Sequence, residues 1–212
     1  MTIRGAFWPM GSGGFKDPFD PQTVLVYQSG GQIITDLFLP RGIYLLDLVG
    51  AGGGQGGFAT NSGVAFNSGG AGSGAAVVGE LVVTTDTWFQ WYSGTVGTSN
   101  RGYVGSGKPG GDSWIRERDN IGCYYACRST NTGSGGWSGH GSGGTLENSG
   151  GFWEKWVPGG ATFYSNGLNG EGGSKVGRWG NGGASVYQGF GKGAGPDDGT
   201  NGLVRITYLR LE

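Results

Sequence analysis

Short runs of β-branched and other apolar residues alternate with glycine and proline along the first half of the chain. The first three runs occupy residues 23–27, 32–39 and 43–49. Serine and glycine at 29–31 separate the first two runs and Pro40 ends the second, as turn residues do between strands. The run at 43–49 is apolar on both faces except at Asp47, which predicts a central strand covered on both sides.

Later runs continue the same β pattern to the end of the chain. They lie within residues 74–92, at 112–116 and at 202–209. The last run alternates apolar and polar positions well enough to serve as a closing strand. No segment carries a convincing helical period. Together the runs predict an all-β protein built as an antiparallel, jelly-roll-like β-sandwich with essentially no helix.

Glycine changes this picture, because 52 of the 212 residues are glycine, against roughly 7% in an average protein. Hydrophobic residues make up only 35% of the chain, yet 8 Trp, 9 Tyr and 10 Phe give 13% aromatics. A flexible linker has no need of so many rings, and disordered chains are poor in them. The composition therefore favours a folded structure in which backbones pack closely.

Some of the glycines recur at every third position. Three such sets are Gly133, Gly136 and Gly139; Gly167, Gly170 and Gly173; and Gly177, Gly180 and Gly183. Three residues per turn is the repeat of the polyproline II helix, which makes no internal hydrogen bonds. Glycine facing each neighbour lets such helices approach closely enough for N–H···O and weak Cα–H···O contacts. The spacing predicts a polyproline II-like bundle, and an irregular glycine-rich loop region is the alternative.

Two parts are expected along the chain, an N-terminal arm at residues 1–22 and a glycine-rich β domain at 23–212. Proline and glycine interrupt the arm, so we expect no regular element in it. Within the domain we expect a β scaffold from 23–116 and 202–212 and a glycine-rich region at 117–201. The aromatic residues of the arm are Phe7, Trp8, Phe15 and Phe19. Their rings need a surface to bury against, which either the chain's own body or a larger assembly can provide.

Several classes of protein are excluded by the same data. Collagen needs strict glycine at every third position and abundant proline, whereas this chain has 7 Pro and irregular glycine. No run of about 20 apolar residues exists, so no membrane insertion is expected. The first residues lack the apolar core of a secretory signal, so we expect assembly in a cytoplasm or export by another route. The 14 basic and 15 acidic side chains form no cationic cluster, so no nucleic-acid binding is expected.

No residue constellation predicts catalysis, a cofactor or a metal. Cys123 and Cys127 are expected to be reduced thiols, since two cysteines and one histidine are too few for zinc. The single histidine, His140, lies among glycines with no partner for a catalytic triad. Residues 197–201 lack the ligand spacing of a calcium loop and are typical of a turn. We therefore expect a protein that is not an enzyme.

An ordered series of short motifs resembles the glycine-rich domain of bacteriophage tail fibres and tail-tip adhesins. The motifs are the Leu39–Pro40 strand end, Gly42, the strand entering the glycine tract at 49–54, the strand at 79–84, Val96–Gly97, Gly110–Ser113, Gly193–Gly195, Asp198–Gly199 and the terminal strand at 202–208. The series covers about residues 23–212 in the family's order. The segments at 117–127 and 152–156 depart from the family pattern and are either receptor-contacting elaborations or local packing.

This resemblance implies a non-enzymatic virion protein of the tail, assembled in the host cytoplasm, that recognises the host surface. The arm would attach it to other tail proteins, the partner would be a surface glycan or an outer-surface protein, and a homotrimer is left open. The candidate receptor-binding residues are Trp137, His140, Trp153, Trp156, Tyr164 and Trp179. Trp153 and Trp156 lie in a glycine-bracketed segment, and one helical turn there would place both rings on one face. The alternatives are a purely structural virion protein and a glycine-rich ice-binding protein.

Overall fold

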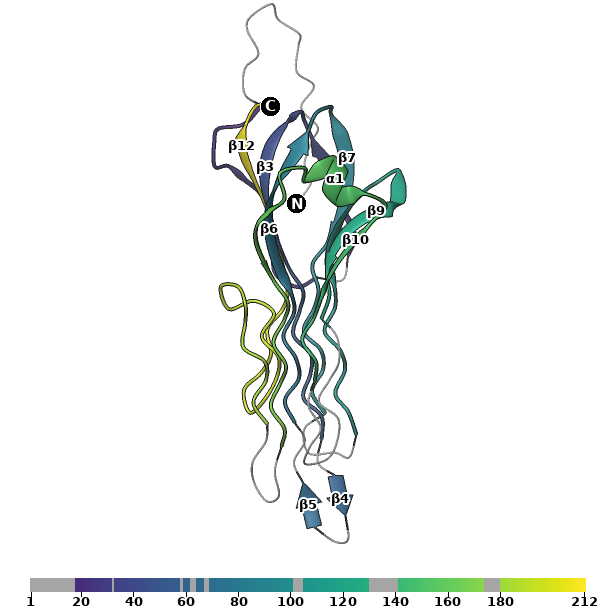
Figure 1. Cartoon of the computed structure of the whole chain (residues 1–212), viewed down its shortest axis with the longest axis vertical. Helices are drawn as coiled ribbons and strands as arrows, with labels where there is room; N and C mark the ends of the chain where they lie inside the picture. Colours follow the sequence, from purple (N-terminus) through teal and green to yellow (C-terminus); the bar gives the residue numbers. More distant parts are fainter. Residues whose placement is uncertain are drawn as a thin grey trace, which may run out of the picture.

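The computed structural model describes residues 18–31, 33–57, 59–61, 64–66, 69–100, 105–129, 141–173 and 180–212. The molecule is long and narrow (Figure 1). Strands gather into two layers at one end, and extended glycine-rich segments run side by side from these layers to the other end. The β-sandwich expected from the sequence is confirmed.

Five antiparallel strands form sheet A, in the spatial order β1-β12-β3-β6-β11. Their bounds are β1 Val24–Gln28, β12 Leu203–Arg210, β3 Gly42–Val49, β6 Ala76–Val83 and β11 Ala161–Ser165. The apolar strand β3 lies in the middle of the sheet, which confirms its predicted central position. Asp47 pairs in register with Arg205 on β12 and with Val78 on β6.

Five more antiparallel strands form sheet B, in the order β10-β9-β8-β7-β2. Their bounds are β10 Leu146–Ser149, β9 Asn120–Cys127, β8 Ser113–Glu117, β7 Thr87–Tyr92 and β2 Thr35–Leu39. The turn predicted at 29–31 therefore leads from β1 in one sheet to β2 in the other. A small hairpin of β4 (Ala59–Asn61) and β5 (Val64–Phe66) lies at the far end of the glycine segments (Figure 1).

The hydrophobic core fills the space between the two sheets. Its fully buried side chains include Tyr44, Leu46, Leu48 and Ile206 from sheet A and Phe89, Ile115 and Tyr125 from sheet B. Cys123 and Cys127 lie here as buried cysteines with no disulfide between them. Burial raises the pKa of the Cys127 thiol, so this sulfur stays protonated and unreactive.

A single helical turn, α1 (Phe152–Trp156), closes one side of the core. It contacts β6, β9 and β10, so it bridges the two sheets. The Phe152 ring stacks on Tyr125 with ring centroids 5.9 Å apart, and the Trp156 ring packs edge-on against Phe89 at 4.9 Å. This turn is the one helix among the described residues, and it is too short to cross a membrane.

The predicted division into a scaffold and a glycine-rich region at 117–201 is wrong. Strands β9, β10 and β11 and helix α1 all come from this range and belong to the sandwich. Conversely, glycine segments at 50–57, 69–75, 93–100 and 105–112 lie outside it. The chain alternates between the two halves of the molecule, because successive glycine segments are continuous with the strands that precede and follow them (Figure 1).

Backbone hydrogen bonds hold the glycine segments together, and the absence of a Cβ on glycine lets neighbouring backbones approach closely enough to form them. Gly183 N donates to Ala71 O at 2.8 Å, and Ala71 N donates to Ala194 O at 2.8 Å, so one segment bonds two neighbours. A Cβ added to Gly170 or Gly180 would lie within 3.0 Å of backbone atoms in an adjacent segment. Close backbone packing explains the glycine content, and polyproline II geometry in these segments stays a prediction.

Candidate binding face

The outer surface of sheet B carries aromatic and arginine side chains on neighbouring strands. Since strand residues alternate between faces, the buried Phe89, Trp91 and Ile115 leave their neighbours pointing outward. We define the aromatic–arginine face as Asp36, Phe38, Trp88, Gln90, Tyr92, Trp114, Arg116 and Arg118. Phe38 and Trp88 are each 42% exposed, which is high for large aromatic side chains on a sheet.

One row of this face joins Phe38 on β2, Trp88 on β7 and Arg118 in the turn that follows β8. Phe38 and Trp88 are register partners on β2 and β7, with ring centroids 5.2 Å apart. Arg118 N donates to Trp88 O at 3.0 Å, which brings the start of the β8–β9 turn beside β7. The Arg118 guanidinium lies 4.8 Å from the Trp88 ring centroid, so a cation–π contact fixes both side chains.

A second row joins Tyr92, Trp114 and Arg116. Tyr92 and Trp114 are register partners on β7 and β8, and their rings stack at 5.8 Å with an interplanar angle of 14°. The Arg116 guanidinium lies 4.7 Å from the Trp114 ring centroid. Both rows therefore place an indole against one further ring and one guanidinium.

A polar row separates these two aromatic rows. Gln90 Nε2 donates to Asp36 Oδ1 at 2.8 Å. The Gln90 amide oxygen accepts from Arg116 Nε at 3.0 Å and from Arg116 Nη2 at 2.7 Å. Asp36, Gln90 and Arg116 are register partners in turn across β2, β7 and β8. The Gln90 amide group forms hydrogen bonds to Asp36 on one side and to Arg116 on the other. The Arg116 guanidinium is therefore held in one orientation before any ligand binds.

Charged side chains continue the face onto β9 and β10. Tyr124 Oη donates to Glu147 Oε1, and Arg128 forms ion pairs with Glu147 and, at 3.5 Å, with Asp112. Burial raises the pKa of the Asp112 carboxyl, and the Arg128 charge opposes this shift. The hydrogen bond to Glu147 raises the pKa of Tyr124. Each of these groups has a structural partner, so none resembles a poised acid or base.

The two tryptophans predicted to form a receptor platform point into the protein instead. The helical turn required for a shared face is present, as α1, but this face packs on the core. Trp156 is 3% exposed, and Trp153 is partly buried with its ring 5.2 Å from that of Tyr125. The prediction for Trp156 is wrong, because the turn closes the open side of the sandwich and needs large apolar side chains there.

The other predicted receptor residues have mixed outcomes. Tyr164 is 47% exposed on edge strand β11, in sheet A, so it lies outside the aromatic–arginine face. Trp137, His140 and Trp179 lie outside the described residues. Of the three predicted residues that the structure describes, Trp153 and Trp156 lie on α1 and Tyr164 on β11, so these three form no common exposed site, and the role of Tyr164 in binding stays a prediction.

The end of the predicted arm packs on the body of the protein. The Phe19 ring meets Tyr208 edge-on at 5.5 Å, and Gln22 N donates to Tyr208 O at 2.8 Å. Phe19 is thus part of the body, whereas Phe7, Trp8 and Phe15 lie outside the described residues.

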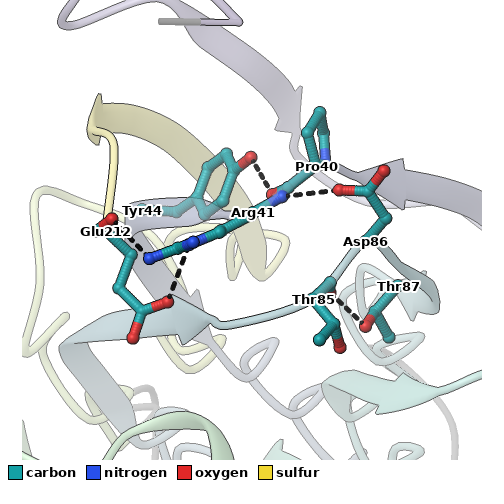
Figure 2. Close-up of polar contacts among 7 residues, drawn as sticks. All are labelled: Pro40, Arg41, Tyr44, Thr85, Asp86, Thr87 and Glu212. Atoms are coloured by element: carbon teal, nitrogen blue, oxygen red, sulfur yellow. Dashed lines mark hydrogen bonds and ion pairs between the residues drawn. The ribbon is translucent and has the colours of Figure 1, made fainter. Parts of the chain in front are cut away.

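Polar contacts tie together the loops at the sandwich end of the molecule. Figure 2 shows Arg41 N donating to Asp86 Oδ1 at 3.0 Å and the Arg41 side chain paired with Glu212. Tyr44 Oη donates to Pro40 O at 2.7 Å in the same group. The β2–β3 loop, the β6–β7 loop and the final residue are therefore joined at one end of the sandwich.

Sequence reasoning missed the aromatic–arginine face, although one signal was present. Residues 87–92 place large side chains at both odd and even positions, which indicates a strand with aromatic residues on two faces. One face of a sandwich strand fills the core, so the other set, Trp88 and Tyr92, had to be exposed. Tyr92 lies beside Trp114 because β7 pairs with β8, and no local sequence pattern encodes this pairing.

The described residues contain no group of three or more His, Cys, Asp or Glu side chains able to hold a metal ion. What the aromatic–arginine face offers is a fixed set of rings, guanidinium groups and one amide, which is chemistry for binding. No protein-family model and no curated protein matches this chain.

Proposed function

We propose that this chain is a non-enzymatic protein of a bacteriophage tail, a fibre or tip component that binds the host cell surface. The resemblance of its ordered glycine motifs to such proteins motivates the tail assignment. The observation that carries the binding role is the aromatic–arginine face. Its rings and guanidinium groups are already fixed by one another, so a ligand would immobilise few side chains on binding.

The arrangement along the long axis is compatible with this role. Residues 18–22 and the carboxyl end both lie at the sandwich end, and the glycine segments extend away from it (Figure 1). An arm that attaches to other tail proteins would hold the sandwich near the particle. The glycine segments would then extend away from the particle, and the aromatic–arginine face would lie along the flank of the molecule, beside the attachment.

Adsorption to cells tests the proposal directly. Fluorescently labelled protein is mixed with candidate host strains, and its ability to block phage adsorption is measured. We expect Trp88→Ala to weaken adsorption at least about thirtyfold, as loss of a binding hot spot of about 2 kcal/mol does. Phe163→Ala is the matched control, because Phe163 is also an exposed aromatic strand residue, 38% exposed, but on sheet A.

Two outcomes would contradict the proposal. The first is that the folded protein adsorbs to no host of a phage that carries it. The second is that Trp88→Ala adsorbs as the unchanged protein does while Phe163→Ala does not, which would move the binding surface to sheet A.

A purely structural role is the second candidate, and one observation favours it. The indoles of Trp88 and Trp114 already contact a ring and a guanidinium, so the same rows can serve only to stabilise sheet B. In that case Trp88→Ala lowers the melting midpoint and leaves adsorption per folded molecule unchanged. Parallel melting and adsorption measurements on this variant distinguish the two roles.

A further inference from the structure

A shallow hollow lies where the sandwich gives way to the glycine segments, beside the end of β1 and the start of β12. Its lining residues are Ser29, Val96, Gln188, Gly189, Phe190, Gly199, Thr200 and Asn201, and its volume is about 420 Å³. Ser29 follows β1 directly and Asn201 lies two residues before β12, so adjacent strands of sheet A frame the hollow. A volume of this size is at the small end of ligand pockets, which span roughly 300–1,000 Å³.

A tight turn between Tyr187 and Phe190 forms one wall of the hollow. Phe190 N donates to Tyr187 O at 3.0 Å, and φ is 48° at Gln188 and 83° at Gly189. Positive φ at both central residues is the mark of a type I′ turn, in which glycine, asparagine and aspartate are preferred. Gln188 is one of two described residues other than glycine with positive φ. Such strain is retained most often where the side chain has a role.

Hydrogen bonds hold this strained turn in place. Ser185 Oγ donates to Phe190 O at 2.6 Å, and Thr200 Oγ1 donates to Gly189 O at 2.8 Å. The Phe190 ring also meets Tyr27 edge-on, with centroids 6.5 Å apart. These bonds hold the backbone of the wall, and the turn places Gln188 at its exposed tip.

The lining is polar but carries no ionisable group. Asn201 Oδ1 is engaged by Val96 N at 2.9 Å and Thr200 Oγ1 by Lys192 N at 2.8 Å, so these two residues shape the site. Within the described part of the chain, no hydrogen bond engages the Gln188 amide or the Ser29 hydroxyl. The nearby Lys192 ammonium pairs with Asp197 at 3.3 Å. A charged ligand would find no counter-charge in the lining, whereas a ligand rich in hydroxyl groups would find donors and acceptors.

We propose that this hollow binds a neutral hexose unit of a glycan. The Gln188 amide would bond two neighbouring hydroxyls of the sugar, one as donor and one as acceptor, and Ser29 would bond a third. The apolar face of the pyranose ring would lie against Phe190. This site is independent of the aromatic–arginine face and of the tail assignment. Because the hollow is open to solvent, we expect weak binding, with a dissociation constant near ~1 mM.

Saturation-transfer NMR on the full chain tests the site with the methyl glycosides of glucose, galactose and N-acetylglucosamine. We expect saturation transfer to at least one of them and none to glucuronate. Gln188→Gly is the decisive variant, because glycine fits positive φ without strain. We expect it to fold with an equal or higher melting midpoint and to lose at least tenfold in affinity. Ile121→Ala, at an exposed position of β9 outside both the hollow and the aromatic–arginine face, should bind the sugar as the unchanged protein does.

Three results would overturn the proposal. These are the absence of saturation transfer to all three neutral sugars, equal transfer to glucuronate, and unchanged affinity of Gln188→Gly. Ser29→Ala adds a second measure, since a loss of affinity is expected there without any change in turn geometry. None of these outcomes depends on whether the protein adsorbs to cells.

Discussion

A single added methyl group should destabilise the glycine segments strongly at Gly110. In the structure, a Cβ at this position would lie 2.5 Å from Ala51 O, 2.5 Å from Gly52 O and 2.8 Å from Ala51 C. Ordinary contacts of a Cβ begin at 3.4 Å, so each carbonyl would have to move by about 0.9 Å. Those carbonyls belong to backbone that is itself hydrogen-bonded, as Ala51 N donates to Gly111 O at 3.0 Å and Gly97 N to Gly52 O at 2.9 Å.

Because backbone cannot rotate away as a side chain can, we expect Gly110→Ala to lose about 2 kcal/mol, within the roughly 1–3 kcal/mol typical of overpacking. For a chain of this size the melting midpoint should fall by about 4–8 °C. Gly159→Ala is the matched control, since no atom lies within 4 Å of its Cβ position and its φ is not positive. There we expect no change or a gain of about 0.4–1 kcal/mol. Equal midpoints for the two variants would refute close backbone packing as the reason for the glycines.

Other consequences of the structure can be measured on the same protein. Alanine at Gly170, Gly180 and Gly183 should each lower the midpoint as Gly110→Ala does, and a rise at all three would contradict the bundle. Trp156→Ala should lower the free energy of unfolding by about 3–5 kcal/mol in urea titrations while adsorption per folded molecule is retained, because its ring fills the core. Deleting residues 1–17 should leave the midpoint unchanged but abolish incorporation into virions, whereas deletion through Phe19 should also lower the midpoint. Burial raises the pKa of Asp47, although Arg205 opposes the shift. Because the pKa of the Asp47 carboxyl is higher in the folded protein than in the unfolded chain, the folded protein takes up the proton first as the pH falls. Its stability therefore increases as the pH falls from the raised pKa toward about 3.9, the ordinary pKa of an aspartate. The stability of the unchanged protein relative to Asp47→Asn should therefore increase across this window in melts between pH 7 and pH 4, and a decrease would contradict the assigned direction.

Local pattern was sufficient for the strands that are long and apolar. Strand β3 was expected at 43–49 with its buried Asp47, and it occupies Gly42–Val49 in the middle of sheet A. Strand β12 was expected at 202–209 and spans Leu203–Arg210. In both, apolar side chains alternate or run continuously, and burial between two layers is the force that selects the strand.

Strands that depend on partners were not expected from the sequence. β10 has a single apolar side chain, β11 exposes its two aromatic side chains, and each is an edge strand that pairs with one neighbour. Their conformation follows from the ladders of β9 and β6, which are distant in the sequence. The short helix α1 is of the same kind, since five residues cannot form a stable helix without the core that Phe152 and Trp156 enter.

The candidate site was harder to predict than the fold for a related reason. The receptor-binding residues were expected in the glycine-rich half of the chain, because aromatic rings there have few neighbouring side chains to cover them. The face on sheet B instead comes from β2, β7 and β8, whose aromatic residues look like core material in isolation. Only the sheet order decides which of two aromatic faces meets the core.

The glycine segments have a consequence for how this protein responds to temperature. They are joined mainly by backbone hydrogen bonds and carry few apolar side chains, so their unfolding would expose polar backbone rather than hydrocarbon. Exposed polar surface lowers the heat capacity of unfolding, whereas exposed apolar surface raises it. The heat capacity change of unfolding per residue should therefore lie below the usual value of about 12–15 cal/mol/K. The reduction should be roughly proportional to the fraction of residues in the glycine segments. The stability of the folded protein would then vary little between low and high temperature.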